Sequence, residues 1–523
     1  MVEMLTPLFV ILCPLIAAPL ILLLGRWANI REGVTLTAAI ATFSLVWSMI
    51  SPVLEGEVIR LSIKTLLPGM KVGFKVDAFG MIFALTASSL WILVSLYSIG
   101  YMRSLKEHAQ TRFYFSFAFA IFGAMGIAMS MNLLTMFIFY EILTVSTYAL
   151  VIHDQTAEAL SAGHKYFAYL LTSGTFFLFG VMMVYYLTGT TDFTNGGIAA
   201  LATLNPVHKW TLIILFICFL LGFMKAAWMP FHSWLPSAMV APTPVSALLH
   251  AVAVVKAGVF GIVRIVCFIY GVDLMGKVWL IWESINLGLV LACVAGFTMI
   301  VANLLAIGQD NLKRRLAYST INQLSYILLG AALLTQYGVA GAMMHIPFHG
   351  YMKITLFLCA GAIMVATGKK NISEMGGIGK TMPITMLAFS VAALGMCGIP
   401  PAVGFISKWY LCSGSIEAGG IMIIFLFALL IASLLDVVYF FPIIHTAFFK
   451  EPEGAVAEPK VKESTSFVVI PLAITATFSV IFFLAYLVKD VTILKPYVAT
   501  LSMHIYDLVS VAIGNVNPQW API

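Results

Sequence analysis

The sequence predicts an all-α polytopic membrane protein, and three observations support this class. Hydrophobic residues make up 61% of the 523 residues, charged residues only 10%, and the mean hydropathy is +1.02. A typical soluble domain is about half apolar and a quarter charged. The apolar residues also gather in long runs, as membrane-spanning helices of about 20 residues require. These features exclude soluble, disordered, collagen-like and coiled-coil proteins.

Fourteen apolar segments follow one another along the chain, joined mostly by short connections. The first has no basic n-region and no small-residue cleavage site, which favours a membrane helix over a removed signal. No connection is long enough to fold as a soluble domain. The predicted spans are 5–25, 33–53, 77–101, 112–130, 132–152, 160–188, 210–229, 243–271, 278–307, 314–335, 338–366, 382–413, 418–449 and 465–488.

Three stretches differ from simple spans. Residues 54–76 alternate apolar and polar side chains around a Pro-Gly pair, a pattern typical of a surface hairpin. Residues 450–464 form a charged, proline-containing loop. Residues 494–515 mix charged and apolar side chains, as an amphipathic helix does that lies against the protein or the membrane surface.

The distribution of lysine and arginine predicts the orientation. Most of those outside the apolar segments lie in the odd-numbered connections, and the Lys313-Arg314-Arg315 cluster is the strongest of these anchors. Basic residues flanking spans stay on the cytoplasmic side. The odd-numbered loops are therefore predicted to be cytoplasmic and both termini to lie outside, in the inner membrane of a prokaryote.

Segments 4–8 and 9–13 form two blocks of five, and an odd number of helices per block gives them opposite orientations. The fourth helix of each block is interrupted beside a lysine: Lys225 in FMKAAWMPFHSWLP and Lys408 in MCGIPPAVGFISKW. Pro347 and Gly350 predict a break in segment 11 too. Inverted repeats with broken helices are typical of ion-coupled transport. The predicted units are 1–111 with three helices and the hairpin 54–76, 112–271 and 278–449 as inverted repeats, and 450–523 with the charged loop, the last span and the C-terminal interfacial helix.

Several ionisable residues lie inside the apolar segments, where a charge costs about 3 to about 10 kcal/mol. Such groups need polar partners or water, and protonatable groups in a row form a pathway for protons. A lysine in an apolar medium readily loses its charge, and histidine exchanges a proton near neutral pH. We therefore predict an ion pathway made of Glu141, Lys225, Lys256, His250, His345, His349, Lys353, Lys408 and Asp436.

Partners are predicted for two of the lysines. Lys225 is the expected partner of Glu141, and Lys408 that of Asp436, or Asp436 is the terminal acid of the pathway. The alternative for each group is structural: a static ion pair, a carboxylate that packs helices together, or a core histidine with a local hydrogen bond.

Other polar groups carry weaker expectations. Lys165 and Arg264 lie nearer segment ends, where a long side chain can extend to the interface. Lys165 and Glu283 are lower-ranked candidates for the pathway, and Glu283 is expected to face water.

His345 and His349 have metal-ligand spacing, but Pro347 lies between them and no third ligand is near, so no metal site is predicted.

Redox and nucleotide motifs are absent from the sequence. There is no GxGxxG after a strand, no Walker A sequence and no haem or iron–sulfur ligand pattern. The seven cysteines lie in or beside apolar runs and make no CxxC. The net charge of +6 comes from scattered residues, which does not indicate nucleic-acid binding. No cofactor is expected in this chain, so the energy for transport must come from an ion gradient or another protein.

Four stretches together resemble one family, across about residues 77–450: MPFHSWLPSAMVAPTPVSALLHAVAVVKAG, DNLKRRLAYSTINQLSYI, HGYMKITLFLCAGAIM and GIPPAVGFISKW. They are similar to the antiporter-like, proton-conducting membrane subunits of respiratory complex I, of Mrp-type Na⁺/H⁺ antiporters and of membrane-bound hydrogenases. The resemblance implies a core of fourteen helices with two inverted five-helix repeats.

The resemblance also implies residue roles. Glu141 matches the family's fifth-helix glutamate, Lys225 its seventh-helix lysine and Lys256 its eighth-helix lysine. The remaining matches are His345, His349 and Lys353 in the eleventh helix and Lys408 in the twelfth; Asp436 matches no position of the family. Lysine at the twelfth-helix position is similar to the Mrp and hydrogenase branch or to the distal complex I subunit, but the long lateral helix of the latter is missing.

Two main hypotheses follow. The first is a proton-translocating subunit of a redox-driven complex, an NADH:quinone oxidoreductase or a hydrogenase, whose partner subunits carry iron–sulfur clusters and other redox centres. The second is a subunit of an Mrp-type antiporter that exchanges Na⁺ for H⁺ without redox partners. A self-contained solute transporter is disfavoured because the pathway offers protonatable groups and no pocket for an organic substrate.

Overall fold

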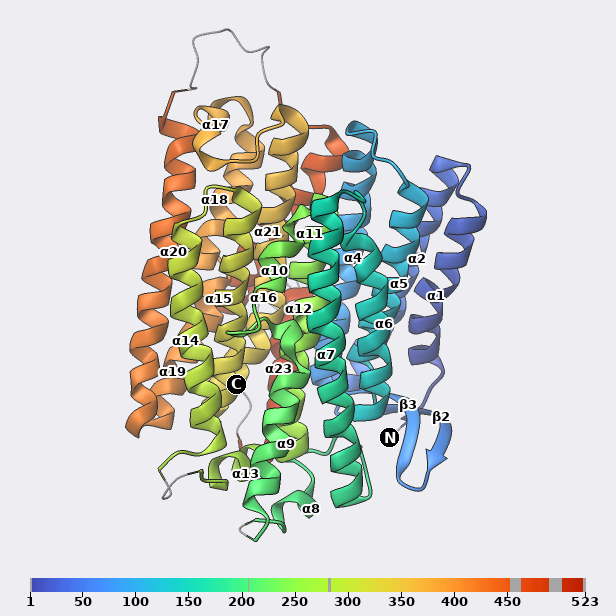
Figure 1. Cartoon of the computed structure of the whole chain (residues 1–523), viewed down its shortest axis with the longest axis vertical. Helices are drawn as coiled ribbons and strands as arrows, with labels where there is room; N and C mark the ends of the chain where they lie inside the picture. The colour runs from blue at the N-terminus through green and yellow to red at the C-terminus, as the bar shows by residue number, and fades with distance from the viewer. Residues whose placement is uncertain (1, 206, 281–283, 452–461, 489–500, 521–523) are drawn as a thin grey trace.

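The computed structural model describes residues 2–205, 207–280, 284–451, 462–488 and 501–520. Most of the elements are helices, and the long ones run side by side along one direction (Figure 1). Within these residues, eleven helices are long and apolar enough to cross a membrane. The predicted class, an all-α polytopic membrane protein, is confirmed.

Three of the fourteen predicted spans fall outside those eleven helices, each for a local reason. Segment 210–229 gives a helix of only 14 residues before its break, and segment 382–413 is divided into two helices of 15 residues. Segment 314–335 is a full helix, but it begins with the Lys313-Arg314-Arg315 cluster and is polar along its length.

The N-terminal part consists of three long helices and a small sheet. Its elements are β1 (Val2–Glu3), α1 (Thr6–Leu23), α2 (Ala28–Ser48), α3 (Ile50–Leu54), β2 (Ile59–Leu67), β3 (Met70–Val76) and α4 (Ala78–Ser104). β2 and β3 pair antiparallel, and β1 adds to β2 in parallel, at the end of the molecule shown at the bottom of Figure 1.

The hairpin turn is held against the end of a distant helix. Gly69 has φ +79°, and a Cβ there would lie 1.9 Å from the carbonyl oxygen of Gly189, so only glycine fits both the turn and the contact. The Tyr185 hydroxyl donates a hydrogen bond to the Pro68 carbonyl over 2.9 Å. The hairpin is therefore tied to the helix that Tyr185 belongs to.

The next stretch contains the first interrupted helix. Its elements are α5 (Gln110–Ala128), α6 (Leu133–Val151), α7 (Ala157–Thr188), α8 (Ala199–Ala202), α9 (Lys209–Gly222), η1 (Met224–Ala226), α10 (Trp234–Ser237), η2 (Ala238–Val240), α11 (Thr243–Ala247), η3 (Leu248–Val252), α12 (Val254–Arg264), η4 (Ile265–Tyr270) and α13 (Val272–Lys277). α9 ends at Gly222, a 3₁₀ turn follows, and Ala227 has a positive φ of 53°. The break beside Lys225 is thus confirmed.

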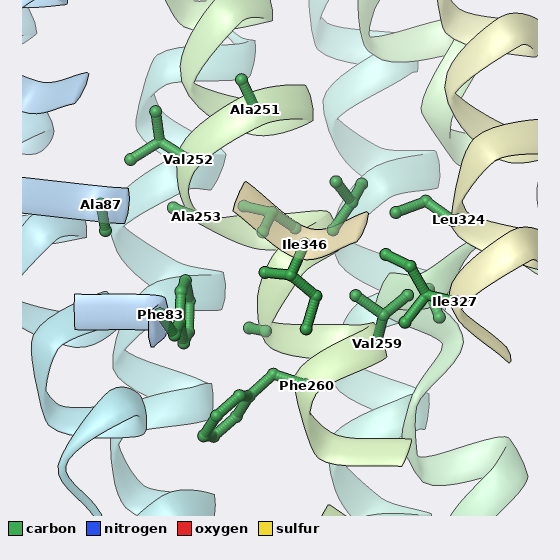
Figure 2. Packing of buried hydrophobic residues seen from close by; sticks show 14 of the residues in the cluster. Phe83, Ala87, Ala251, Val252, Ala253, Val259, Phe260, Leu324, Ile327 and Ile346 are labelled. Atoms are coloured by element: carbon green, nitrogen blue, oxygen red, sulfur yellow. The ribbon is translucent and has the colours of Figure 1, made fainter. Parts of the chain in front are cut away.

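Residues 243–270 form one rod with two π-helical stretches, η3 and η4, which the sequence did not predict. Every residue in the most apolar window of this rod is buried inside the protein, compared with 28% for the window in residues 420–449. Figure 2 shows its side chains packed against those of α4 and of the helices that contain Leu324 and Ile346. Polar groups on the rod therefore have only protein around them.

The second block has a break at the predicted twelfth helix and none at the eleventh. Its elements are α14 (Leu287–Ile307), α15 (Leu312–Ala332), α16 (Gln336–Thr367), η5 (Ile372–Glu374), α17 (Ile378–Thr381), α18 (Pro383–Cys397), α19 (Gly404–Ala418), η6 (Gly420–Ile423) and α20 (Ile424–Phe449). The chain leaves the helix between Cys397 and Gly404, through two prolines.

The interruption predicted at Pro347 and Gly350 is wrong, because α16 is one helix of 32 residues with Pro347 inside it. A proline removes one backbone hydrogen bond from a helix and can bend it without ending it. α16 is buried on all sides around this point, where surrounding helices stabilise the irregularity.

The C-terminal part contributes α21 (Ser466–Val488) and α23 (Leu501–Val516). α23 packs on α4, α16 and α21, and the Tyr506 hydroxyl donates to the Phe482 carbonyl over 2.7 Å. This is the region predicted as a C-terminal interfacial helix; its first residues, 494–500, and most of the charged loop 450–464 lie outside the described residues.

A buried ion pair joins the start of α4 to the end of α12. Both guanidinium NH₂ groups of Arg264 donate to the Asp77 carboxylate over 2.6 Å, and four phenylalanine rings surround the guanidinium at 4.8–5.1 Å. Arg264 is 1% exposed, so the expectation that it extends to the interface is wrong. Asp77 also accepts a bond from Gly80 N–H and so caps α4.

We predict that Arg264→Ala destabilises the protein by about 3–5 kcal/mol, because it leaves the Asp77 carboxylate buried without a counter-charge. Removing both groups in Asp77→Ala/Arg264→Ala should cost less than Arg264→Ala alone. Thermal unfolding of the purified chain in detergent measures this, with the exposed Arg26→Ala as control. An Arg264→Ala protein as stable as the wild type would contradict the assignment.

Candidate functional site

All nine higher-ranked candidates lie in the transmembrane bundle, on α6, η1, η3, α12, α16, α19 and α20. Eight of them are buried, and Glu141 is half-buried. The structure brings the second-block groups and Lys256 of the first block into one cluster and leaves the other first-block groups, Glu141, Lys225 and His250, apart from it.

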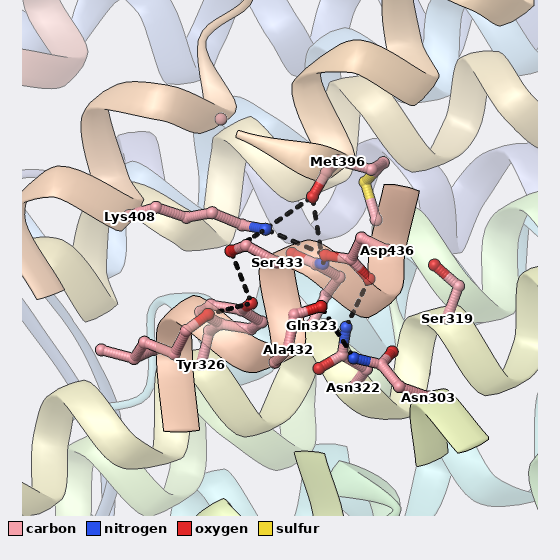
Figure 3. A network of polar contacts seen from close by, with 12 residues as sticks. Asn303, Ser319, Asn322, Gln323, Tyr326, Met396, Lys408, Ala432, Ser433 and Asp436 are labelled. Atoms are coloured by element: carbon pink, nitrogen blue, oxygen red, sulfur yellow. Dashed lines mark hydrogen bonds and ion pairs between the residues drawn. The ribbon is translucent and has the colours of Figure 1, made fainter. Parts of the chain in front are cut away.

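Lys408 and Asp436 form the best-connected pair. The Lys408 ammonium lies 2.9 Å from Asp436 Oδ2 and also donates to the Met396 carbonyl, 2.6 Å away, and to the Ser433 hydroxyl, 3.1 Å away (Figure 3). The break after α18 frees the Met396 carbonyl from its helical partner, which makes it available to the lysine. The predicted Lys408–Asp436 pair is therefore present in the structure.

Polar side chains of α15 complete the coordination of Asp436. The Asn322 amide donates to Oδ1 over 2.8 Å and the Gln323 amide to Oδ2 over 2.9 Å, while the Tyr439 hydroxyl donates to Oδ1 over 2.5 Å. These three neutral donors and the Lys408 cation offset part of the cost of burying the carboxylate.

Gln323 links this pair to the histidines of α16. Its amide oxygen lies 3.1 Å from His345 Nε2, and His345 Nδ1 lies 2.8 Å from the Ser407 hydroxyl. The rings of His345 and His349 are near-parallel, at 18°, with centroids 5.9 Å apart. The Lys256 ammonium in turn lies 2.7 Å from His349 Nδ1. Hydrogen bonds thus connect Lys256 to His349, and His345 through Gln323 and Asp436 to Lys408. The step between His349 and His345 has a ring contact instead of a hydrogen bond.

Lys353 joins the same cluster by a side branch. Its ammonium donates to the Ser319 hydroxyl over 2.9 Å, and the Tyr439 hydroxyl lies 2.9 Å from the same oxygen. Because Tyr439 also contacts Asp436, Lys353 is connected to Asp436 through two hydroxyl groups.

Lys225 and Glu141 do not form the ion pair expected of them. The Lys225 ammonium donates to the Tyr140 carbonyl over 2.6 Å and lies 3.2 Å from the centre of the Tyr140 ring, while no ion pair involving Glu141 occurs in the described part of the chain. The 3₁₀ turn of η1 directs the lysine to the residue before Glu141 rather than to its carboxylate.

The Glu141 carboxylate is instead packed against a glycine of α7. A Cβ at Gly174 would lie 2.2 Å from Glu141 Oε1, and this buried oxygen has no hydrogen-bond partner among the described residues. Gly174 therefore provides the space that the carboxylate occupies, and Glu141 is free to gain a partner by a small movement.

The remaining candidates are more isolated. His250, on η3, is fully buried with its ring 4.6 Å from that of Phe357, and neither ring nitrogen has a partner among the described residues. Lys165 is half-buried and donates to the Ser237 hydroxyl over 3.2 Å. Glu283 lies outside the described residues.

Close packing brings the two groups of candidates together. A Cβ at Gly258 of α12 would lie 2.2 Å from the backbone nitrogen of Ala226 in η1. Lys225 and Lys256 therefore sit on elements whose backbones touch, although no hydrogen bond joins their side chains.

Sequence reasoning missed the polar residues of α15 and their tyrosine partner. The signal was the stretch STINQLSY, which places Ser319, Asn322, Gln323 and Tyr326 at intervals of three and four residues, on one side of a helix otherwise suited to the membrane. In a bundle interior, such a stripe indicates partners for buried charges on other helices.

A cavity of about 580 Å³ opens at the end of the bundle shown at the top of Figure 1. It is lined by acidic and basic loop residues and reaches the α16 residues Ala360 and Met364. This is the end where the lysine and arginine distribution predicts the cytoplasm.

Two family profiles match parts of this chain. The family profile described as NADH:quinone oxidoreductase/Mrp antiporter, TM, matches residues 130–435, and the profile for the N-terminus of complex I chain 5 matches residues 68–114.

Two relatives and one solved structure show the kinds of protein to which this chain is similar. The chain is 33% identical to NADH-quinone oxidoreductase subunit N of Desulforudis audaxviator, over 85% of this chain and 86% of that protein. It is 30% identical to a Staphylococcus aureus protein named putative antiporter subunit mnhA2, over 80% of this chain but only 53% of that longer protein. A structure of the membrane-bound sulfane sulfur reductase, an archaeal respiratory membrane complex, contains a chain with 25% identity and a TM-score of 0.81, with 98% and 99% of the two chains covered.

The family match over more than half of the chain and the identity to these relatives lead to one conclusion: the chain belongs to the family of antiporter-like membrane subunits that NADH:quinone oxidoreductases and Mrp antiporters share.

Proposed function

We propose that this chain is the proton-translocating membrane subunit of a multisubunit, redox-driven complex of the complex I or membrane-bound hydrogenase type. The observation that carries the proposal is the buried succession of Lys256, His349, His345, Asp436 and Lys408, in which the Gln323 amide bridges His345 and Asp436 by hydrogen bonds. Static packing needs paired charges, but it does not need two stacked histidines and a lysine–histidine contact in series.

In this proposal the two groups of residues have different tasks. The second-block cluster together with Lys256 is a nearly continuous relay, in which the lysines, the histidines and Asp436 can accept and donate protons while the Gln323 amide bridges two of them. Lys225 and Glu141 form a gate, because Glu141 Oε1 has no hydrogen-bond partner in the described part of the chain and a movement of either side chain would make or break an ion pair between them. His250 lies between the cavity end and the relay and would supply it with protons.

The proposal extends to the organisation of the chain in the membrane. Fourteen crossings, with residues 112–271 and 278–449 as inverted repeats, are consistent with the breaks observed at α9–η1 and α18–α19. The odd-numbered loops, including those that line the cavity, would then face the cytoplasm of a prokaryote, and both termini the outside.

The partners would be other membrane subunits and hydrophilic redox subunits that carry the iron–sulfur clusters. This chain is similar to subunit N of an NADH-quinone oxidoreductase and to a chain of an archaeal respiratory membrane complex, and its sequence has no cofactor motif of its own. Redox energy released in those subunits would have to be transmitted to the gate through contacts between proteins.

The second candidate function is that of a subunit in a gradient-driven Mrp-type Na⁺/H⁺ antiporter. It is favoured by the 30% identity to the putative antiporter subunit over 80% of this chain. Copurification separates the two functions: a tagged chain should bring down hydrophilic iron–sulfur subunits if the first holds and only small membrane subunits if the second holds.

We predict that Lys408→Ala reduces proton translocation by the reconstituted complex about 100-fold or more. Removing the relay cation leaves Asp436 unpaired in the bundle, adds several kcal/mol to the barrier, and each 1.36 kcal/mol is tenfold in rate. Proton uptake into vesicles, followed with a pH-sensitive dye, measures the effect, and Lys64→Ala on the exposed hairpin is the matched control. Full translocation by Lys408→Ala would contradict the relay.

We predict that Lys225→Ala and Glu141→Gln each abolish proton translocation while the complex still assembles. Neither change disrupts the Lys408–Asp436 cluster, so assembly on native gels and electron transfer in the partner subunits test the fold separately. Retained pumping by both variants would overturn the gate.

We predict that Gly174→Ala also slows translocation, although it changes no charge. The added methyl would displace the Glu141 carboxylate, whose Oε1 lies 2.2 Å from the position of that Cβ. Gly33→Ala, where a Cβ meets nothing within 4 Å, is the control and should pump normally. If Gly174→Ala pumps as fast as Gly33→Ala, the position of the carboxylate does not matter for transport.

A further inference from the structure

Two loops meet at the same end of the molecule as the cavity and bring three metal-ligand side chains together. Glu107 and His108 lie between α4 and α5, and His153 follows α6. One ligand atom of each, a carboxylate oxygen or an imidazole nitrogen, lies within 4.8 Å of those of the other two. None of the three belongs to the proposed relay.

The hydrogen bonds of this cluster leave the ligand atoms available. His108 Nε2 lies 3.0 Å from the His153 carbonyl oxygen, which only accepts, so Nε2 carries the proton and Nδ1 has a free lone pair. That Nδ1 lies 3.9 Å from Glu107 Oε2. Arg112 donates to the same carbonyl over 2.6 Å and helps to fix this loop.

His153 gives the second, independent observation. Its side chain is 0% exposed, yet neither ring nitrogen has a hydrogen-bond partner within the described residues. A buried polar group without a partner costs about 1–3 kcal/mol, which a bound ligand would recover.

The cavity gives a dissolved ion access to the cluster. Glu107 lines the cavity of about 580 Å³, together with Asp154 and Glu158, so an ion can reach the cluster through it. Arg112 and the basic cavity residues Lys313, Arg314, Lys369 and Lys370 repel a positive ion, so the donor atoms of the cluster must hold it. The cavity provides both an access route and space for a water ligand.

We propose that Glu107, His108 and His153 form a binding site for a divalent transition-metal ion of the Zn²⁺ class, with water in the fourth position. Two imidazole nitrogens and one carboxylate are a donor set that suits such ions. The bound ion would clamp the α4–α5 loop to the α6–α7 loop at the rim of the cavity. This site is independent of the proposed relay and of the source of energy for transport.

The test uses the full chain purified with a chelator and reconstituted into lipid nanodiscs. Zn²⁺ alone is titrated by calorimetry, and Co²⁺ replaces it to give the absorption bands of a four-coordinate site. We expect one site in the wild type, an affinity at least about 100-fold lower in His153→Ala, and recovery of binding in His153→Cys, since thiolate is also a zinc ligand.

Two further variants keep the result interpretable. His108→Ala changes a half-exposed side chain that is not in the core and should lose the site without loss of folding. The exposed His164→Ala, on nearby α7, should bind as the wild type does. Zn²⁺ should also raise the melting temperature of the proteins that bind it, namely the wild type, His164→Ala and His153→Cys, and not that of His108→Ala or His153→Ala. Equal Zn²⁺ affinity in the wild type and His108→Ala, or no one-site binding in the wild type, would overturn the proposal.

Discussion

The cost of placing charge inside an apolar bundle determines which polar contacts this structure must make. Each buried ionised group needs several donors or acceptors around it, because neither lipid nor bulk water supplies them there. Asp436 has four such partners and Arg264 has a carboxylate and four aromatic rings. The interruption between α18 and α19, the polar stripe of α15 and the N-terminal cap of α4 all supply groups that meet this requirement.

The two blocks meet this requirement to different degrees. In the second block, the lysine, aspartate and histidines share neighbours, so a proton taken up at one group changes the charge felt by the next. In the first block, Lys225 binds a backbone carbonyl and an aromatic face, and Glu141 stands beside a glycine with one oxygen unpartnered. A group with few hydrogen-bond partners can gain or lose one by a small movement. The gate is therefore proposed at Lys225 and Glu141 in the first block, and the relay in the second-block cluster.

Much of this arrangement could be predicted from the sequence, and the rest depended on tertiary contacts. Composition and run length gave the class, and the Gly-Pro-rich stretches beside Lys225 and Lys408 gave two true breaks. The pairing of Lys408 with Asp436 followed from the scarcity of buried acids. The same reasoning failed for Pro347, where packing keeps α16 continuous, and for Glu141, because the direction of a lysine side chain depends on a turn that the sequence does not specify. Arg264 was misjudged because its partner, Asp77, lies 187 residues away at the end of another helix.

The unbroken course of α16 has a consequence for the direction of charge movement. Residues four apart lie on one side of a helix, about 6 Å apart along its axis, so His345, His349 and Lys353 form a column of about 12 Å. The contacts of Lys256 with His349 and of Lys408 with Asp436 run from one helix to another, whereas this column runs along a helix that crosses the membrane. A full crossing of about 30 Å involves about 2.3 kcal/mol per 100 mV, so a charge that moves the length of the column exchanges about 1 kcal/mol per 100 mV with the membrane potential. α16 is thus an element through which the voltage itself can act on the pathway.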